Sequence, residues 1–342
     1  MNLAMCHVAT CLPLLFALSG VPTYATPCEN LTALTIPSTA ITAAVPVPAG
    51  PFSPVASDGR AGAAARSFPA FCHVTAIARP VPDSEIHVEV WLPENSAWNG
   101  KLPGTGNGGY SGAIGYTDME HGLRLGYAVA GSDTGHPGGD LKFGVGHPEK
   151  INDWAWRAVH VMTETAKLVA RSYYGRFAAH SYFSGCSTGG QQALTEAQRY
   201  PGDYGGILAG DPGYNRVRLN IGFLWSWLAA NADASAPLPA AKLALIIKAA
   251  IAACDAADGV KDGIIGEPLS CKFDPAALRC NGVDGADCLT ESQVAAVRAI
   301  YDGAKNQIEK AGINYHYNES TGGHTWANWR IYLNEFAPSL FK

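Results

Sequence analysis

The sequence predicts an α/β protein with a parallel sheet that helices cover on both faces. Between residues 126 and 212, apolar runs of strand length alternate with helical segments; parallel strands are apolar throughout because neither face meets water. A serine also lies between two glycines in SGCSTGG, residues 184–190, where a predicted strand meets a predicted helix. The chain has 342 residues, of which 47% are hydrophobic, so it can form a sizeable buried core.

The strands of this sheet are expected in the first two thirds of the chain. Residues 26–70 are rich in Ala, Pro, Ser and Thr and are expected to be irregular, and residues 101–112 form a glycine-dense loop. Strand character is found in segments 71–79, 85–92, 126–135, 180–186 and 204–212. Residues 153–172 and 189–200 are expected to be helices.

The composition changes after residue 213. The next segment is alanine-rich and helical, then acidic and cysteine-rich, which indicates an inserted lid domain rather than more sheet. INYHYNE, residues 313–319, predicts a strand, and residues 326–341 predict an amphipathic terminal helix. The expected domains are a signal peptide at 1–25, a core at 26–213, a lid at 214–303, and a final core strand with C-terminal helix at 304–342.

The N-terminus and the charge bear on where the protein works. Residues 8–20 form a short apolar stretch, and the small residues before Thr26 offer a cleavage site, although the first seven residues lack Lys and Arg. We therefore expect a secreted or periplasmic protein; the alternative is a plain apolar leader. The net charge of −5 argues against nucleic-acid binding, no apolar run has the length of a membrane span, and nothing indicates an oligomeric state.

Cysteine usage supports export. Nine cysteines are present, and two of them lie in the predicted signal peptide. Four of the other seven crowd into residues 254–288, where disulfides would stabilise a loop-rich region. Zinc is the competing interpretation, but no CxxC pair occurs.

GCSTG, residues 185–189, matches the G-x-S-x-G pattern of a nucleophile elbow. Such a serine sits on a strained turn between strand and helix, so its neighbours must be small. Ser187 is the predicted nucleophile, and the backbone N–H of Thr188 is a predicted oxyanion donor. Gly108, in the loop GNGGYSG, is the expected second donor. The alternative is a glycine-rich turn without catalytic function.

Several motifs together resemble the tannase/feruloyl esterase family of secreted α/β-hydrolases. They are GTGNGGYSG, GSDTGH, YFSGCSTGGQQALTEAQRYP, GILAGDP and CDAADGVKDGII, and they span roughly residues 28–303. The resemblance implies an α/β-hydrolase fold with an inserted lid domain, and hydrolysis of aromatic esters such as gallates, ferulates or terephthalate monoesters. It also implies disulfides Cys28–Cys72, Cys254–Cys271 and Cys280–Cys288.

The acidic loop CDAADGVKDGII is a candidate calcium site. It places three aspartates within eight residues, and hard oxygen ligands suit Ca²⁺. The spacing is not that of an EF-hand. The resemblance implies a structural Ca²⁺ held by Asp255, Asp258 and Asp262 and by the carbonyls of Val260 and Ile264. The alternative is a solvated acidic turn.

The C-terminal part departs from the family pattern, so the fold is expected to be shortened. The family places its catalytic histidine in a His-Cys pair after the lid, joined by disulfide to the cysteine before the nucleophile. No such dipeptide follows residue 213. Residues 309–342 instead resemble the esterase-D or enterochelin-esterase-like enzymes, which implies His324 as the base and a joint near residues 302–309. Thr325, not a cysteine, follows His324, so the partner that the family pattern implies for Cys186 is missing. Cys186 is therefore expected to be the one of the seven cysteines without a disulfide partner in the chain.

The catalytic acid is the least defined member of the predicted site. Asp211 follows the strand after the nucleophile helix and is the first candidate, with Asp302 as the second. His136, in the SDTGH loop, is expected to hold that loop by hydrogen bonding. The predicted function is a secreted serine esterase. The alternative is a truncated or recombined hydrolase that binds aromatic ligands or calcium without efficient turnover.

Overall fold

The computed structural model describes residues 25–54, 66–110, 112–268 and 270–311. The described chain divides into two compact units, one ending at Pro212 and one beginning at Gly213. Within these ranges no helix combines the length and the apolar character that a bilayer span requires.

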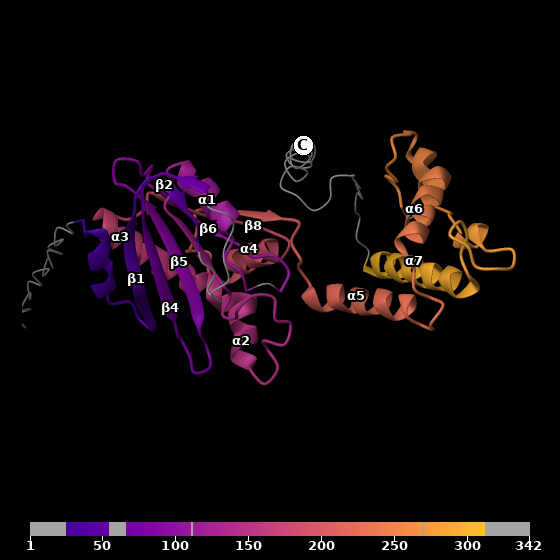
Figure 1. Ribbon diagram of the computed structural model, residues 1–342, viewed down its shortest axis with the longest axis horizontal. Helices are drawn as coiled ribbons and strands as arrows, with labels where there is room; N and C mark the ends of the chain where they lie inside the picture. Colours follow the sequence, from indigo (N-terminus) through magenta and orange to yellow (C-terminus); the bar gives the residue numbers. More distant parts are fainter. Residues whose placement is uncertain (1–24, 55–65, 111, 269, 312–342) are drawn as a thin grey trace, which may run out of the picture. The chain divides into compact units, whose positions relative to one another are not determined.

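The first unit is built on a mixed seven-stranded sheet (Figure 1). Its order is β1 (Thr39–Val47), β4 (Phe71–Ala78), β5 (Ile86–Pro93), β7 (Val129–Ser132), β6 (Lys101–Thr105), β8 (His180–Cys186) and β9 (Gly206–Gly210). The last four strands run parallel, as predicted. The prediction of a wholly parallel sheet is wrong for β1, β4 and β5, which pair antiparallel because short connections join β4 to β5.

Residues 26–70 are more regular than expected. They form the 3₁₀ helix η1 (Cys28–Ala33), strand β1, and a separate two-stranded ribbon of β2 (Gly50–Phe52) and β3 (Arg66–Phe68). Strand β1 contains Pro46, which cannot donate to a ladder. It is tolerated because β1 lies at the edge of the sheet.

Helices cover both faces of the sheet, as predicted. Val90 of β5 belongs to the core cluster that includes α3 (Ala158–Tyr174). Trp91, the next residue, packs on the opposite face with Met119 and Leu123 of α1 (Tyr116–Arg124), since successive strand side chains alternate in direction. Two short turns, α2 (Pro148–Asn152) and the π-helical η2 (Asp153–Arg157), lead into α3.

The glycine-dense segment 101–112 is only partly a loop, because its first five residues form β6. Gly104 suits this strand: a Cβ atom there would lie 2.4 Å from the Tyr204 hydroxyl and 3.3 Å from the Phe183 ring. A larger residue would not fit this packed part of the core. The glycine in the strand therefore reflects close packing, and the loop begins only at Gly106.

The second unit is helical. It contains α5 (Arg216–Ala230), α6 (Ala240–Cys254), the 3₁₀ turns η3 (Asp255–Asp258) and η4 (Pro275–Leu278), and α7 (Glu291–Ala311). The expected boundary at 303/304 lies inside α7, which is continuous to Ala311. The predicted strand 313–319 and helix 326–341 lie outside the described residues.

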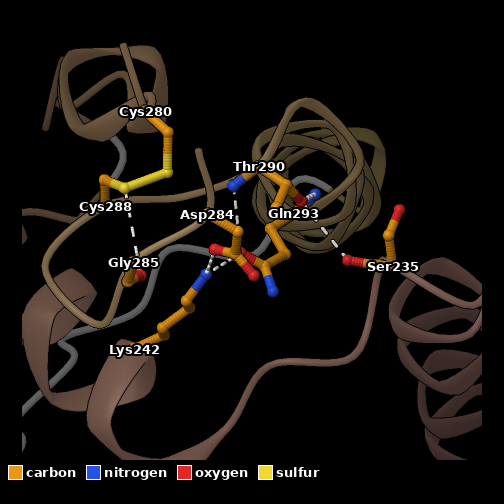
Figure 2. Close-up of a disulfide and its surroundings, with 8 residues drawn as sticks. All are labelled: Ser235, Lys242, Cys280, Asp284, Gly285, Cys288, Thr290 and Gln293. Carbon is orange, nitrogen blue, oxygen red and sulfur yellow. Dashed lines mark hydrogen bonds and ion pairs between the residues drawn. A yellow bond between two sulfur atoms is a disulfide. The ribbon is translucent and has the colours of Figure 1, made fainter. Parts of the chain in front are cut away.

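A buried lysine holds part of this unit together (Figure 2). Lys242 of α6 is 4% exposed and donates to Asp284 and, at 2.8 Å, to Oε1 of Gln293. The Gln293 amide in turn donates to the Pro237 carbonyl. The Cys280–Cys288 disulfide closes the loop that carries Asp284. The cation is thus paired and hydrogen-bonded, which offsets the cost of its burial.

The three disulfides implied by the resemblance are confirmed. Cys28–Cys72 joins η1 to β4, while Cys254–Cys271 and Cys280–Cys288 lie in the second unit. Cys186 belongs to none of them.

Candidate active site

Ser187 lies at the turn between β8 and α4 (Thr188–Arg199), with φ 61° and ψ −113°. A non-glycine residue rarely adopts a positive φ, and such strain marks turns that the surrounding structure enforces. The turn is held by hydrogen bonds from the Ser187 amide to the Gly210 carbonyl and from the Gln191 amide to the Ser187 carbonyl. This geometry is that of a nucleophile elbow.

The glycines around Ser187 are required by close backbone contacts. A Cβ atom at Gly185 would lie 2.4 Å from the Gly189 carbonyl carbon. A Cβ atom at Gly106 would lie 2.7 Å from the Gly189 Cα, and one at Gly190 would lie 2.3 Å from the Gly210 oxygen. The glycine loop, the elbow and the end of β9 therefore meet at backbone distance.

The loop after β6 is fixed against α4. The Asn107 amide donates to Oε1 of Gln192 at 3.0 Å, and the Asn107 side chain donates to the carbonyls of Ala113 and Ser132, each at 2.8 Å. The Thr188 hydroxyl donates to the Gly109 carbonyl at 2.7 Å. Gly108 lies between these two attachments, so the loop that carries the predicted oxyanion donor is positioned beside the start of α4.

The predicted catalytic base and the two candidate acids lie in different parts of the chain. Asp211 directly follows Gly210, whose carbonyl binds the Ser187 amide, and its φ is 35°. Asp302 is an exposed residue of α7 in the second unit. His324 lies outside the described residues. The structure thus brings Asp211 to the elbow and places the competing acid, Asp302, in another unit.

Charges near the elbow act on the thiol next to the nucleophile. Burial raises the pKa of Cys186, and the carboxylates of Asp211 and, more weakly, Asp118 raise it further. Burial also raises the pKa of Asp118, on α1.

Three residues of this region were not singled out from the sequence. Gln192 and Asn107 form the buried amide pair that holds the glycine loop, and Asp118 lies near the elbow. The signal for Gln192 was its place on the buried face of the helix after Ser187. Nothing in the sequence around Asp118 indicates its position, because only the packing of α1 brings this residue near the elbow.

The SDTGH loop after β7 is held by its own polar residues. The His136 ring, 1% exposed, is hydrogen-bonded to the Tyr110 carbonyl at 2.8 Å and stacks on Phe143, so its predicted role in holding the loop is confirmed. Asp133 accepts from the Gly135 amide and from the backbone amide of His87. Its carboxylate also bonds the His87 ring, and this hydrogen bond raises the pKa of His87.

The acidic loop of the second unit is folded around its aspartates. The buried Asp255 carboxylate accepts from the amides of Asp262 and Gly263, Asp258 accepts from the amides of Val260 and Gly266, and Asp262 accepts from the Ile264 amide. The donor chemistry suits Ca²⁺. In this conformation the three carboxylates do not all lie within 4.8 Å of one another, so a shared ion would draw them closer together.

The mixed sheet, the strand–serine–helix turn and the covering helices define an α/β-hydrolase fold. A model of the family described as tannase and feruloyl esterase matches residues 72–330. The chain therefore belongs to the tannase and feruloyl esterase family. The match passes the boundary near residue 303 that we expected; the resemblance of residues 309–342 to esterase-D-like enzymes is not shown and stays a prediction.

Individual relatives agree with this assignment. The chain is 40% identical over 307 residues to an uncharacterized esterase of Xanthomonas campestris, covering 88% of this chain and 52% of that protein. It is 35% identical over 237 residues to a probable feruloyl esterase B-2 of Aspergillus flavus, covering 67% and 44%. The chain thus spans about half the length of the curated relatives it matches.

Solved structures show the same fold. The crystal structure of feruloyl esterase B from Aspergillus oryzae superposes with a TM-score of 0.69 at 31% identity, covering 79% of this chain and 54% of that one. Tannin acyl hydrolase from Aspergillus niger, at 20% identity and a TM-score of 0.60, shows similarity of fold alone.

Proposed function

We propose that this protein is a serine hydrolase of carboxylic esters whose acids are aromatic, of the gallate, ferulate or terephthalate type. The observation that carries the proposal is the positive φ of Ser187 at the start of α4, because this strain presents a serine hydroxyl for attack. Membership of the tannase and feruloyl esterase family supports the substrate class.

The proposed reaction passes through an acyl-enzyme. The Ser187 hydroxyl attacks the ester carbonyl carbon while His324 takes its proton, and the backbone N–H groups of Thr188 and Gly108 stabilise the oxyanion. The protonated His324 then gives the proton to the departing alcohol, and water hydrolyses the acyl-enzyme. Asp211 is the proposed acid that orients His324, since it lies at the elbow.

Calcium has a structural role in this proposal. Asp255, Asp258 and Asp262, with the carbonyls of Val260 and Ile264, would hold Ca²⁺, and a bound ion would stabilise the loop between α6 and the Cys254–Cys271 disulfide. The buried Asp255 supports this, because a buried carboxylate benefits from a cation.

We also propose that the protein acts in the periplasm or outside the cell. Three disulfides support this location, since such bonds persist in oxidising compartments.

The function is tested with the full chain, Ser187→Ala and, as a matched control, Ser172→Ala on α3. Methyl ferulate, methyl gallate and an aliphatic methyl ester serve as substrates, and a fluorophosphonate probe reports covalent labelling by peptide mass. We expect labelling at Ser187 and a loss of kcat of about 10⁴-fold or more in Ser187→Ala only. Equal turnover by all three proteins would exclude the serine mechanism, and binding of ferulate without turnover would favour the ligand-binding alternative.

A further inference from the structure

A second cluster of chemically active side chains lies in the first unit, outside the proposed ester site. It consists of His160 on α3, Glu196 on α4 and Asp203 in the turn before β9. One donor atom from each residue lies within 4.8 Å of the other two. The His160 Nδ1 and the Asp203 Oδ2 are 2.6 Å apart.

Glu196 is the unusual member of this cluster. Its exposure is 0%, and neither carboxylate oxygen accepts a hydrogen bond from a described N–H or hydroxyl group; its hydrogen-bonding neighbour is the carboxyl group of Asp203. Two buried carboxyl groups that face each other cannot both ionise without a compensating cation, because each loses water and the two charges repel. Burial and, second, the charge of Asp203 raise the pKa of Glu196.

Glu89 provides the contrast within the same protein. It is also buried beside a histidine, but its oxygens accept hydrogen bonds from Trp91 and Tyr116 and are bonded to the His73 ring. Protein donors therefore satisfy the carboxylate of Glu89, whereas Glu196 faces a second carboxyl group, that of Asp203, instead of a donor.

We propose that His160, Glu196 and Asp203 bind one divalent transition-metal ion of the zinc type. One imidazole nitrogen and two carboxylates form a donor set that such ions accept, with a fourth position left for water. The two carboxylates would balance the charge of a divalent ion. Binding replaces the His160–Asp203 hydrogen bond, because ligand atoms around tetrahedral zinc lie about 3.4 Å apart.

The surroundings of the cluster resemble an outer ligand shell. Glu164 Oε2 lies 3.6 Å from Nε2 of His160, while Nδ1 faces Asp203. Lys167 lies 3.4 Å from the second oxygen of Asp203. The His160 ring stacks on Tyr200 with centroids 3.7 Å apart, which fixes its orientation.

One member of the cluster, Asp203, lines a surface cleft. This cleft of about 470 Å³ is also lined by Glu164 and Lys167. Bound metal would tie α3, α4 and the turn before β9 together, and so would support the helix that begins at Ser187. The proposal does not depend on the ester chemistry.

The test is zinc binding by the full chain in calcium-containing buffer, after removal of transition metals with a chelator. Equilibrium dialysis against Zn²⁺ followed by metal analysis gives the stoichiometry for the wild type, Glu196→Gln and the matched control Glu89→Gln. Circular dichroism verifies that each variant is folded, and His160→Asn serves as the second site variant.

We expect the wild type and Glu89→Gln each to bind one zinc ion tightly. Glu196→Gln and His160→Asn should bind zinc with an affinity at least a hundredfold weaker. Zinc should also raise the melting temperature of the wild type but not that of Glu196→Gln. The proposal is overturned if the wild type binds no zinc, in which case Glu196 is a neutral buried acid, or if Glu196→Gln binds zinc as tightly as the wild type.

Discussion

Asn107 and Gln192 stand 85 positions apart in the chain, and each donates a hydrogen bond to the other. The Asn107 backbone amide donates to Oε1 of Gln192 at 3.0 Å, and Nε2 of Gln192 donates to Oδ1 of Asn107 at 3.2 Å. Both residues are buried. The pair fixes the glycine loop to the helix that begins at the elbow. The two predicted oxyanion donors, Gly108 and Thr188, are therefore held at fixed positions relative to each other.

Replacing Gln192 with Leu should impair both stability and turnover. The buried Asn107 amide would lose its acceptor, which costs about 1–3 kcal/mol, and displacement of Gly108 should lower kcat about 10²-fold with a smaller change in KM. Urea unfolding and steady-state kinetics on an aromatic ester measure the two effects. Gln198→Leu, an exposed position on the same helix, is the control; an equal loss of kcat there would contradict the role of the pair.

Ser187→Gly should separate stability from activity. Glycine adopts the positive φ of this turn without strain, which is worth about 1 kcal/mol or more and offsets its greater freedom in the unfolded chain. We therefore expect Ser187→Gly to unfold at a urea concentration at least as high as Ser187→Ala, while both lose esterase activity. A glycine variant that is clearly the less stable of the two would show that the turn is not strained.

Removal of calcium should lower the melting temperature of the full chain. An ion that binds only the folded protein stabilises it by about 2.7 kcal/mol at a hundredfold excess over Kd. The readout is the difference in melting temperature between calcium and chelator, which Asp255→Asn should abolish because that carboxylate holds the loop. Asp287→Asn, an exposed acid of the same unit, should retain the difference.

The thiol of Cys186 should react slowly at neutral pH. Burial and the negative charge of Asp211 raise its pKa, so a smaller fraction is thiolate, and the alkylation rate should still be rising tenfold per pH unit above pH 8. Asp211→Asn removes one cause of the shift and should increase the rate of iodoacetamide labelling at pH 8. Cys186→Ala gives the background, and an unchanged pH profile in Asp211→Asn would place that carboxylate too far away to act.

Three of the four parallel strands, β7, β8 and β9, were predictable because they are short, apolar and bounded by turn residues, whereas the glycine and proline of β6 predicted a loop. The strand predicted at 180–186 agrees with β8 residue for residue, and the motif at Ser187 predicted the turn that follows. Strand β1 was missed because its alanines, threonines and Pro46 have little strand character, and only pairing with β4 stabilises it.

The site was predictable where its chemistry is local and unpredictable where it depends on packing. The elbow and its small neighbours lie within a few consecutive residues, so their pattern is visible in the sequence. Gln192 acts through a residue 85 positions away, and Glu196 becomes exceptional only because folding removes water from it and places it against the carboxyl group of Asp203. Neither of these contacts can be predicted from the residues next to Gln192 or Glu196 in the sequence.

The Cys28–Cys72 disulfide closes residues 28–72 into a covalent ring. Everything from η1 through the start of β4, including β1 and the β2–β3 ribbon, lies between the two joined cysteines. A protease that cuts the chain once inside this ring cannot release a fragment, so the nicked molecule keeps its mass until a reductant is added. In surroundings rich in peptidases, the edge strand β1 would stay tethered beside β4 after a cut that would otherwise detach it.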